Sequence, residues 1–198
     1  AGLALFLMTA SQSMAQPGPP RPRDTTIKGP QTFALIMSVS KYKYVKPLDY
    51  AVKDAELFRD YLKSPAGGSL NDDNIYYIAD ELANEANFQV KGAAWLKAKK
   101  LQKGDRLFIY MAGHGDAIDE DRFFYLTYDC NPAGDKNNYL IAGAIRMSDI
   151  KIMISKETRK SVDVFLVMDA CRTGDLPGGE EGRGFFTTSI SEVRAGEM

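Results

Sequence analysis

Residues 162–174 read VDVFLVMDACRTG, and the interpretation of the whole chain depends on this stretch. Its first half is an apolar run of strand length, whereas its second half becomes polar and ends in a glycine. The pattern predicts a buried strand that carries Cys171 to the rim of a sheet. Taken alone, the stretch also fits a small buried cysteine at a strand end, which is the commoner role of a lone cysteine.

The segments before this stretch alternate between two periodicities. Apolar runs of strand length occur at 32–39, 74–79 and 106–112. Between them, apolar residues recur at helical spacing over 48–62, after Pro47, and over 86–101. Strand, helix, strand, helix, strand in this order predicts an α/β fold with a mostly parallel central sheet. A further strand at 123–128, a helix at 145–155 and a strand starting within 184–193 complete the predicted elements.

Composition limits the classes of function. The chain has 198 residues, enough for one sizeable core, and its 25 basic and 26 acidic residues give a net charge of -1. This balance argues against a general nucleic-acid binder and against a polybasic membrane surface. The two cysteines do not make a disulfide framework, and no internal repeat is apparent. His114 is the one histidine, so it is the one imidazole available for acid–base chemistry.

The N-terminal residues carry a pattern that is typical of export. Residues 1–15 combine a short apolar run with Ser13-Met14-Ala15, and we interpret them as a partial signal peptide. The run is shorter than the ~20 residues that span a bilayer. A disordered or interfacial tail is the alternative interpretation, because the signal-peptide pattern is short. We therefore expect a periplasmic or extracellular protein without stable membrane insertion. Residues 16–31 are predicted to form a proline-rich linker, and 32–198 the folded domain.

Two reactive side chains are expected at one edge of the sheet. His114 follows the predicted strand 106–112 within a Gly-His-Gly sequence, and Cys171 follows the later strand. Because the carboxyl ends of parallel strands meet at the same edge, a cysteine–histidine dyad can form there. The imidazole would take the thiol proton and later protonate a leaving amine. The backbone amides of Gly115 and Cys171 are the candidate oxyanion donors.

These motifs resemble those of caspase-type peptidases, the superfamily that also contains metacaspases, paracaspases, legumains and gingipains. The resemblance rests on YMAGHGD around His114, on VFLVMDACRTG around Cys171 and on the opening FALIMSV with AVKDAELF. It implies a caspase-like three-layer α/β/α sandwich and a cysteine endopeptidase that acts through a thioacyl-enzyme. It covers the large-subunit part, from about Phe33 to at least Gly174, so we expect the chain to be truncated before the small-subunit part.

The metacaspase branch is the most similar within this superfamily. Metacaspases carry an aspartate two residues before the nucleophile, as Asp169 is here, and an acid early in the first helix, as Asp54 is. The resemblance implies that both acids line the primary specificity pocket, and two carboxylates there favour cleavage after Arg or Lys. Arg172 departs from the histidine that is common after the nucleophile in that branch.

The sequence supports no cofactor or metal, and it leaves activation by calcium open. The aspartate cluster that binds calcium in several metacaspases has no clear counterpart, because the nearby acids occur at a different spacing: Asp119, Glu120, Asp121 and Asp175. Cys130 is interpreted as structural or incidental. Arg183, in a glycine-rich stretch, is a candidate self-cleavage site for an enzyme of this specificity.

Two other functions are compatible with an α/β fold. The first is a catalytically silent caspase-like module that acts in protein–protein interaction, which loss of either His114 or Cys171 would have favoured. The second is a nucleotide-binding fold, but a glycine-rich phosphate loop is missing after the first strand, where SVSKYKY stands. We therefore expect a protein or peptide as the partner, and the sequence leaves the oligomeric state open.

Overall fold

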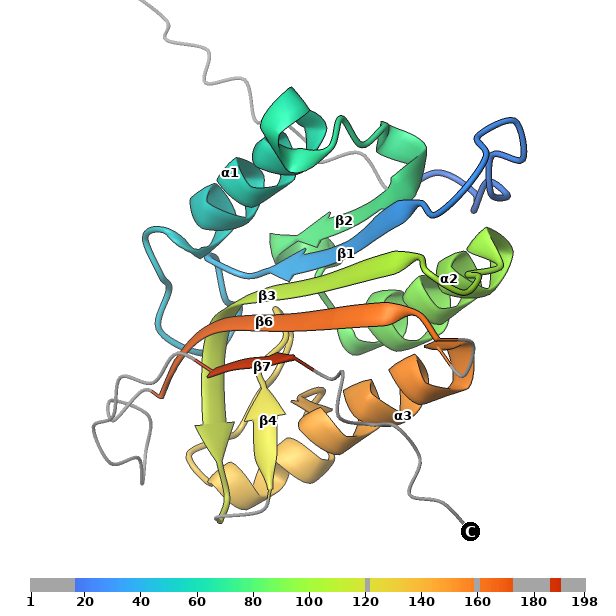
Figure 1. Cartoon of the computed structure of the whole chain (residues 1–198). Helices are drawn as coiled ribbons and strands as arrows, with labels where there is room; N and C mark the ends of the chain where they lie inside the picture. Colours follow the sequence, from blue (N-terminus) through green and yellow to red (C-terminus); the bar gives the residue numbers. More distant parts are fainter. Residues whose placement is uncertain (1–16, 120–121, 159–160, 173–185, 190–198) are drawn as a thin grey trace, which may run out of the picture.

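A seven-stranded sheet forms the centre of the molecule. The computed structural model describes residues 17–119, 122–158, 161–172 and 186–189 (Figure 1). In chain order the strands are β1 (Thr32–Ser38), β2 (Ile75–Ala79), β3 (Arg106–Ala117), β4 (Phe123–Tyr125), β5 (Ile145–Arg146), β6 (Asp163–Arg172) and β7 (Phe186–Ser189). Strands β2, β1, β3 and β6 lie side by side and are parallel, and β7 joins β6 in antiparallel orientation. The predicted mostly parallel sheet is thereby confirmed.

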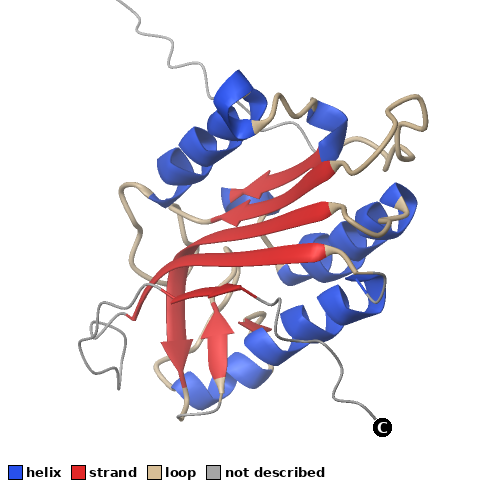
Figure 2. Ribbon diagram, in the orientation of Figure 1, coloured by secondary structure: helices blue, strands red, loops and turns tan. Residues whose placement is uncertain are grey.

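Helices cover both faces of this sheet (Figure 2). Alternate residues of β3 point to opposite faces, as strand geometry requires: Leu107, Ile109 and Met111 pack in one core, and Phe108 and Tyr110 in the other. The first core receives residues from η4 (Ala86–Gly92), α2 (Ala93–Lys99) and α3 (Met147–Thr158), and the second from α1 (Ala51–Lys63). The α/β/α sandwich is confirmed. Short 3₁₀ helices lie at η1 (Pro65–Gly67), η2 (Asp72–Asn74), η3 (Asp80–Leu82) and η5 (Lys136–Leu140).

The central strand β3 is longer than the sequence predicts. We predicted that it ends at Ala112, but it continues to Ala117 and therefore contains His114. Beyond the end of β1, β4 pairs with Gly115–Ala117 in antiparallel orientation and supplies new partners for the backbone. In Figure 1 the second half of β3 turns away from the line of β1, and β4 lies beside it. The strand β6 likewise runs through Cys171 to Arg172, where the sequence predicts a turn.

Two of the three predicted helices begin at other places than predicted. Helix α1 begins at Ala51, because the preceding turn is tied back to Ser40: the Leu48 amide donates to the Ser40 carbonyl, and the Val52 amide donates to the Ser40 hydroxyl. The second helix begins at Ala86, as predicted, and its first part is the π-helix η4. The third helix, α3, begins at Met147, because β5 pairs with β4 just before it. No helix among the described residues is long and apolar enough to cross a membrane.

The proline-rich segment before β1 is anchored to the domain by a buried ion pair. The Nη1 and Nη2 atoms of Arg23 both contact the Asp105 carboxylate. The Arg23 side chain is only 7% exposed, and the Asp105 side chain is 0% exposed. Asp105 also accepts the backbone amides of Gln31, at 2.8 Å, and Gln102, at 2.7 Å. This one carboxylate thus links the N-terminal segment to the starts of β1 and β3. The predicted partial signal peptide and Arg183 lie outside the described residues.

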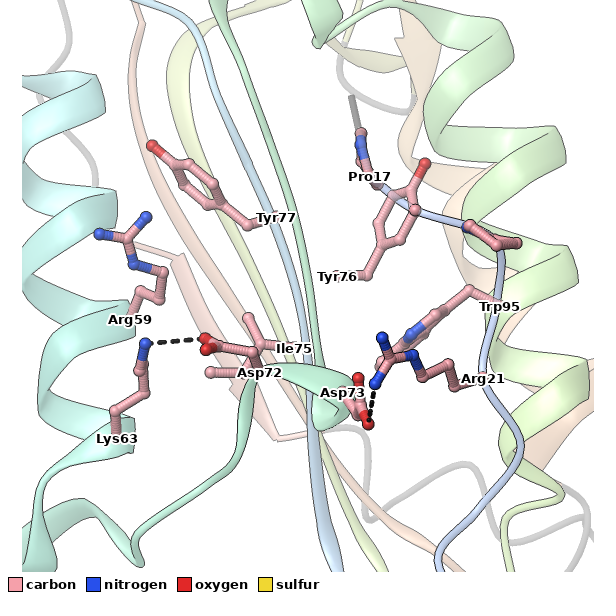
Figure 3. A pocket seen from close by; sticks show the side chains of 12 residues that line it. Pro17, Arg21, Arg59, Lys63, Asp72, Asp73, Ile75, Tyr76, Tyr77 and Trp95 are labelled. Carbon is pink, nitrogen blue, oxygen red and sulfur yellow. Dashed lines mark hydrogen bonds and ion pairs between the residues drawn. The ribbon is translucent and has the colours of Figure 1, made fainter. Parts of the chain in front are cut away.

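A pocket with a volume of about 560 Å³ lies at the free edge of the sheet, beside β2. Ion pairs from Lys63 to Asp72, at 2.7 Å, and from Arg21 to Asp73, at 3.2 Å, cross its wall (Figure 3). The lining residues come from the N-terminal segment, α1, η2, β2 and α2, and include neither a cysteine nor a histidine. This pocket is therefore separate from the predicted dyad.

We expect Arg23→Ala to lower the free energy of unfolding by about 3 kcal/mol, because it leaves the buried Asp105 carboxylate without its counter-charge. The matched control is Arg21→Ala, in the same segment, because the Arg21 side chain is 73% exposed. Loss of such an exposed pair is expected to change stability by about 0.5 kcal/mol or less. Urea denaturation of the two variants measures both values. Equal effects would contradict the anchoring role of Arg23.

Candidate active site

His114 is a buried residue held by the loop that follows β1. His114 is only 2% exposed, and its Nε2 atom lies 2.8 Å from the Lys46 carbonyl oxygen. Because a carbonyl oxygen only accepts, this contact assigns the proton to Nε2 and leaves a lone pair on Nδ1. The Nδ1 atom is buried and has no hydrogen-bond partner among the residues that the structure describes. The contact with Lys46 therefore fixes the ring and leaves Nδ1 able to accept a proton.

Tyr42 supports the same histidine from two directions. The His114 amide donates to the Tyr42 hydroxyl at 2.6 Å, and the two rings lie 4.8 Å apart between their centroids. Burial lowers the pKa of His114 below its ordinary 6.5, and this outweighs the opposing effect of the hydrogen bond to the Lys46 carbonyl. The imidazole is therefore neutral near pH 7, the form that a general base requires.

The loop that contacts His114 is itself fixed by other backbone hydrogen bonds. The Asp80 carboxylate accepts the amides of Ser40 and Lys41, each at 2.8 Å. Farther along, the Lys43 amide donates to the Tyr128 carbonyl at 3.0 Å. These contacts fix the loop in addition to its contacts with His114.

Both glycines that flank His114 sit where a side chain would not fit. A Cβ atom on Gly113 would lie 2.6 Å from the Tyr42 hydroxyl and 2.8 Å from the Tyr125 hydroxyl. A Cβ atom on Gly115 would lie 2.4 Å from the Phe123 ring. The Gly-His-Gly sequence is thus required by the packing of aromatic rings around the histidine. The proposed role of the Gly115 amide as an oxyanion donor stays a prediction.

The sheet register aligns the two predicted dyad residues. In the parallel ladder of β3 and β6, His114 and Cys171 are direct partners. Neighbouring strands lie about 4.8 Å apart, so their backbones are adjacent although they are distant in sequence. The structure therefore brings the backbone positions of the histidine and the cysteine together at the carboxyl end of the sheet.

One of the two predicted pocket acids, Asp169, is hydrogen-bonded to Tyr110, which the sequence did not single out. Asp169 lies in β6, and its Oδ2 accepts a hydrogen bond of 3.1 Å from the Tyr110 hydroxyl. Asp54 lies in the first turn of α1, on the same side of the sheet. Burial raises the pKa of Tyr110, and the negative charges of Asp169 and then Asp54 raise it further. The structure thus joins Asp169 to Tyr110 by a hydrogen bond and places Asp54 on the helix that packs over Tyr110.

The second cysteine is not part of this arrangement. Cys130 is a free, buried thiol in a small cluster with Phe124, Leu126 and Tyr139. Burial raises the pKa of Cys130 to about 12, so its thiol is protonated and unreactive at neutral pH. This environment fits the predicted structural role.

Acidic side chains near β4 are occupied by neighbouring groups. Asp119 accepts the Arg122 amide at 2.9 Å and its guanidinium at 2.7 Å, and Asp116 accepts the Tyr139 hydroxyl at 2.9 Å. Within the described part of the chain, no cluster of three or more histidine, cysteine or acidic side chains is placed to hold a metal ion.

Contacts between distant segments explain why the sequence missed Tyr42, Lys46 and Tyr110. Tyr42 and Lys46 are 72 and 68 positions from His114, and Tyr110 is 59 from Asp169. The stretch that contains Tyr42 has no motif that points to His114, and its one informative feature is the lack of a phosphate-binding glycine loop. Tyr110 lies in a buried strand, where a tyrosine is not unusual. The sequence indicates only that a buried tyrosine hydroxyl needs a hydrogen-bond partner, and it does not show which residue that partner is.

Comparison with known proteins agrees with this fold. The crystal structure of protein GSU0716 from Geobacter sulfurreducens resembles it with a TM-score of 0.53 and 17% sequence identity, over 72% of this chain and 51% of that chain. The chain thus spans about half the length of that protein, and the likeness concerns the fold alone. No curated protein matches the chain.

A family model matches most of the chain and identifies its family. The model described as the caspase domain matches residues 31–195, a range that includes both His114 and Cys171. That model defines a class of cysteine peptidase-type hydrolases. The chain belongs to the caspase-domain family.

Proposed function

We propose that the protein is a cysteine endopeptidase in which Cys171 is the nucleophile and His114 the general base. One observation carries the proposal: His114 and Cys171 are partners in the β3–β6 register, and the His114 ring is oriented by its bond to Lys46. That bond holds the proton on Nε2 and leaves Nδ1 to accept one. Family membership supports the same reaction class.

The chemistry follows from these roles. His114 Nδ1 takes the proton of the Cys171 thiol, and the thiolate attacks the carbonyl carbon of the scissile peptide bond. The backbone amides of Gly115 and Cys171 stabilise the oxyanion that forms. The imidazolium then protonates the leaving amine, which yields a thioester on Cys171. A water molecule, deprotonated by His114, attacks this thioester and releases the acid product with the free thiol.

The proposed specificity is for a basic residue before the cleaved bond, as in metacaspases. Asp169 lies two positions before Cys171 in β6, and Asp54 lies in the first turn of α1, the helix that packs over Tyr110. Two carboxylates in a partly buried site attract a guanidinium or an ammonium group and repel an acidic side chain. The expected substrate is therefore a protein or peptide cleaved after Arg or Lys.

Two fluorogenic peptides that differ only in the residue before the cleaved bond test this proposal. We expect kcat/KM for the arginyl peptide to exceed that for the aspartyl peptide by about a hundredfold or more, because like charges in the pocket are costly. Assays with and without added calcium belong to the same experiment. Cleavage after Asp but not after Arg or Lys would contradict the specificity, and no cleavage at all would favour a catalytically silent interaction module.

Export is part of the proposal and is supported by the signal-like pattern of residues 1–15. The expected place of action is the periplasm or the outside of the cell. Cell fractionation that finds the protein with the cytoplasmic markers would contradict it.

A further inference from the structure

Tyr110 is a nearly buried phenol between the sheet and helix α1. It lies four residues before His114 in β3, and it is only 7% exposed. Its ring stacks on Phe58 of α1, with 4.7 Å between centroids and 18° between planes. Stacking fixes the ring, because a tyrosine packed in this way keeps few rotamers. The hydroxyl is therefore held in a defined position.

The Tyr110 hydroxyl points to the site of the two acids. It donates to Asp169 Oδ2 at 3.1 Å. Asp54 lies one helical turn before Phe58, so both residues are on the face of α1 that covers Tyr110. The shifted pKa of Tyr110, raised first by burial and then by Asp169 and Asp54, keeps the phenol protonated. The hydroxyl is thus a permanent donor to Asp169, and Asp54 lies on the helix that covers it.

The hydrogen bond from Tyr110 reduces the number of carboxylate oxygen positions that are free to accept from a bound cation. The Tyr110 hydroxyl uses Asp169 Oδ2, so a bound side chain must share Asp169 with it and reach Asp54 for a second contact. A guanidinium is planar and presents five N–H donors in a fixed fork, so it can bridge two separate acceptors. An ammonium is a compact point charge on a flexible stem, and it gains less from two acceptors that are held apart.

We propose that Tyr110 is a positioning residue that makes the site select arginine over lysine, by holding Asp169 for a bridging guanidinium. This inference rests on the proposed function of the same site. Tyr110 acts through Asp169 and takes no part in the bond-breaking steps. Its loss should therefore change the recognition of the basic side chain more than the rate of the chemistry.

The test is Tyr110→Phe, which removes the hydroxyl and keeps the ring on Phe58. Kinetics are measured with two peptides that differ only in Arg or Lys before the cleaved bond. We expect the arginine-to-lysine ratio of kcat/KM to fall about fivefold, mainly through a higher KM for the arginyl peptide. The matched control is Tyr76→Phe, which removes a buried hydroxyl that donates to the Asn87 carbonyl at 2.8 Å in the other core.

The control separates selectivity from stability. Thermal unfolding should show a loss for both variants, whereas the arginine-to-lysine ratio should change only in Tyr110→Phe. An unchanged ratio in Tyr110→Phe, beside an active wild-type enzyme, would overturn this inference alone. An equal fall in Tyr76→Phe would overturn it as well. A wild-type protein that cleaves after neither residue would overturn the proposed function together with it.

Discussion

Replacement of Cys171 by alanine is expected to lower kcat/KM for an arginyl peptide by at least about a thousandfold, because the covalent route needs a thiolate. The second thiol cannot take over, since Cys130 is buried and burial raises its pKa to about 12. Steady-state kinetics on the purified variant measure the loss. Retention of activity by Cys171→Ala would contradict the whole mechanism.

Alkylation gives a readout that needs no peptide substrate. We expect iodoacetamide to add one group to the folded wild-type protein near neutral pH and none to Cys171→Ala, because the Cys130 thiol stays protonated. The matched variant is Cys130→Ala, which should keep the adduct and the activity. Mass spectrometry that locates the adduct on Cys130 would contradict this assignment.

Replacement of His114 by glutamine is expected to lower kcat/KM by about a hundredfold to ten-thousandfold, the usual contribution of a general base. Glutamine can still donate to the Lys46 carbonyl, so the loop after β1 keeps its contact. What it lacks is the basic nitrogen at the position of Nδ1. The same arginyl peptide serves for this variant, and a loss of less than about tenfold would argue against His114 as the base.

The same variant also tests the protonation of His114 in the folded state. Burial depresses the pKa of His114 below 6.5, so the unfolded chain binds this proton more tightly than the folded protein does. The contribution of His114 to stability is therefore complete above pH 6.5 and is lost as the pH falls below that value. Urea denaturation across this window should show the decline in the wild type and a smaller one in His114→Gln. Equal declines would contradict the depressed pKa.

The sequence predicts the layers of this fold better than the ends of its elements. The apolar runs that became β1 and β3 and the stripe that became α1 are local patterns, and each was visible in the sequence. The ends depend on partners from elsewhere in the chain. Pairing with β4 extends β3 through His114, and pairing of β5 delays the start of α3. A local sequence pattern cannot predict such pairings, because each depends on a second strand elsewhere in the chain.

The candidate site divides in the same way. His114 and Cys171 were predicted because strand ends in a parallel sheet converge, and this rule needs only the strand order. The groups that orient His114 come from the loop after β1, which contains no recognisable motif. The Lys46 group that binds His114 is a backbone carbonyl, which every residue carries, so the sequence gives no sign of it. The stacking of Tyr110 on Phe58 likewise depends on how α1 crosses the sheet.

The ion pair between Arg23 and Asp105 has a practical consequence for the limits of the domain. The family match begins at residue 31, eight positions after Arg23. A fragment cut at the family limit would keep the buried Asp105 and discard the cation that neutralises it. We therefore expect a stable fragment to begin earlier than the family match, inside the proline-rich segment. Expression trials should place the first residue before Arg23.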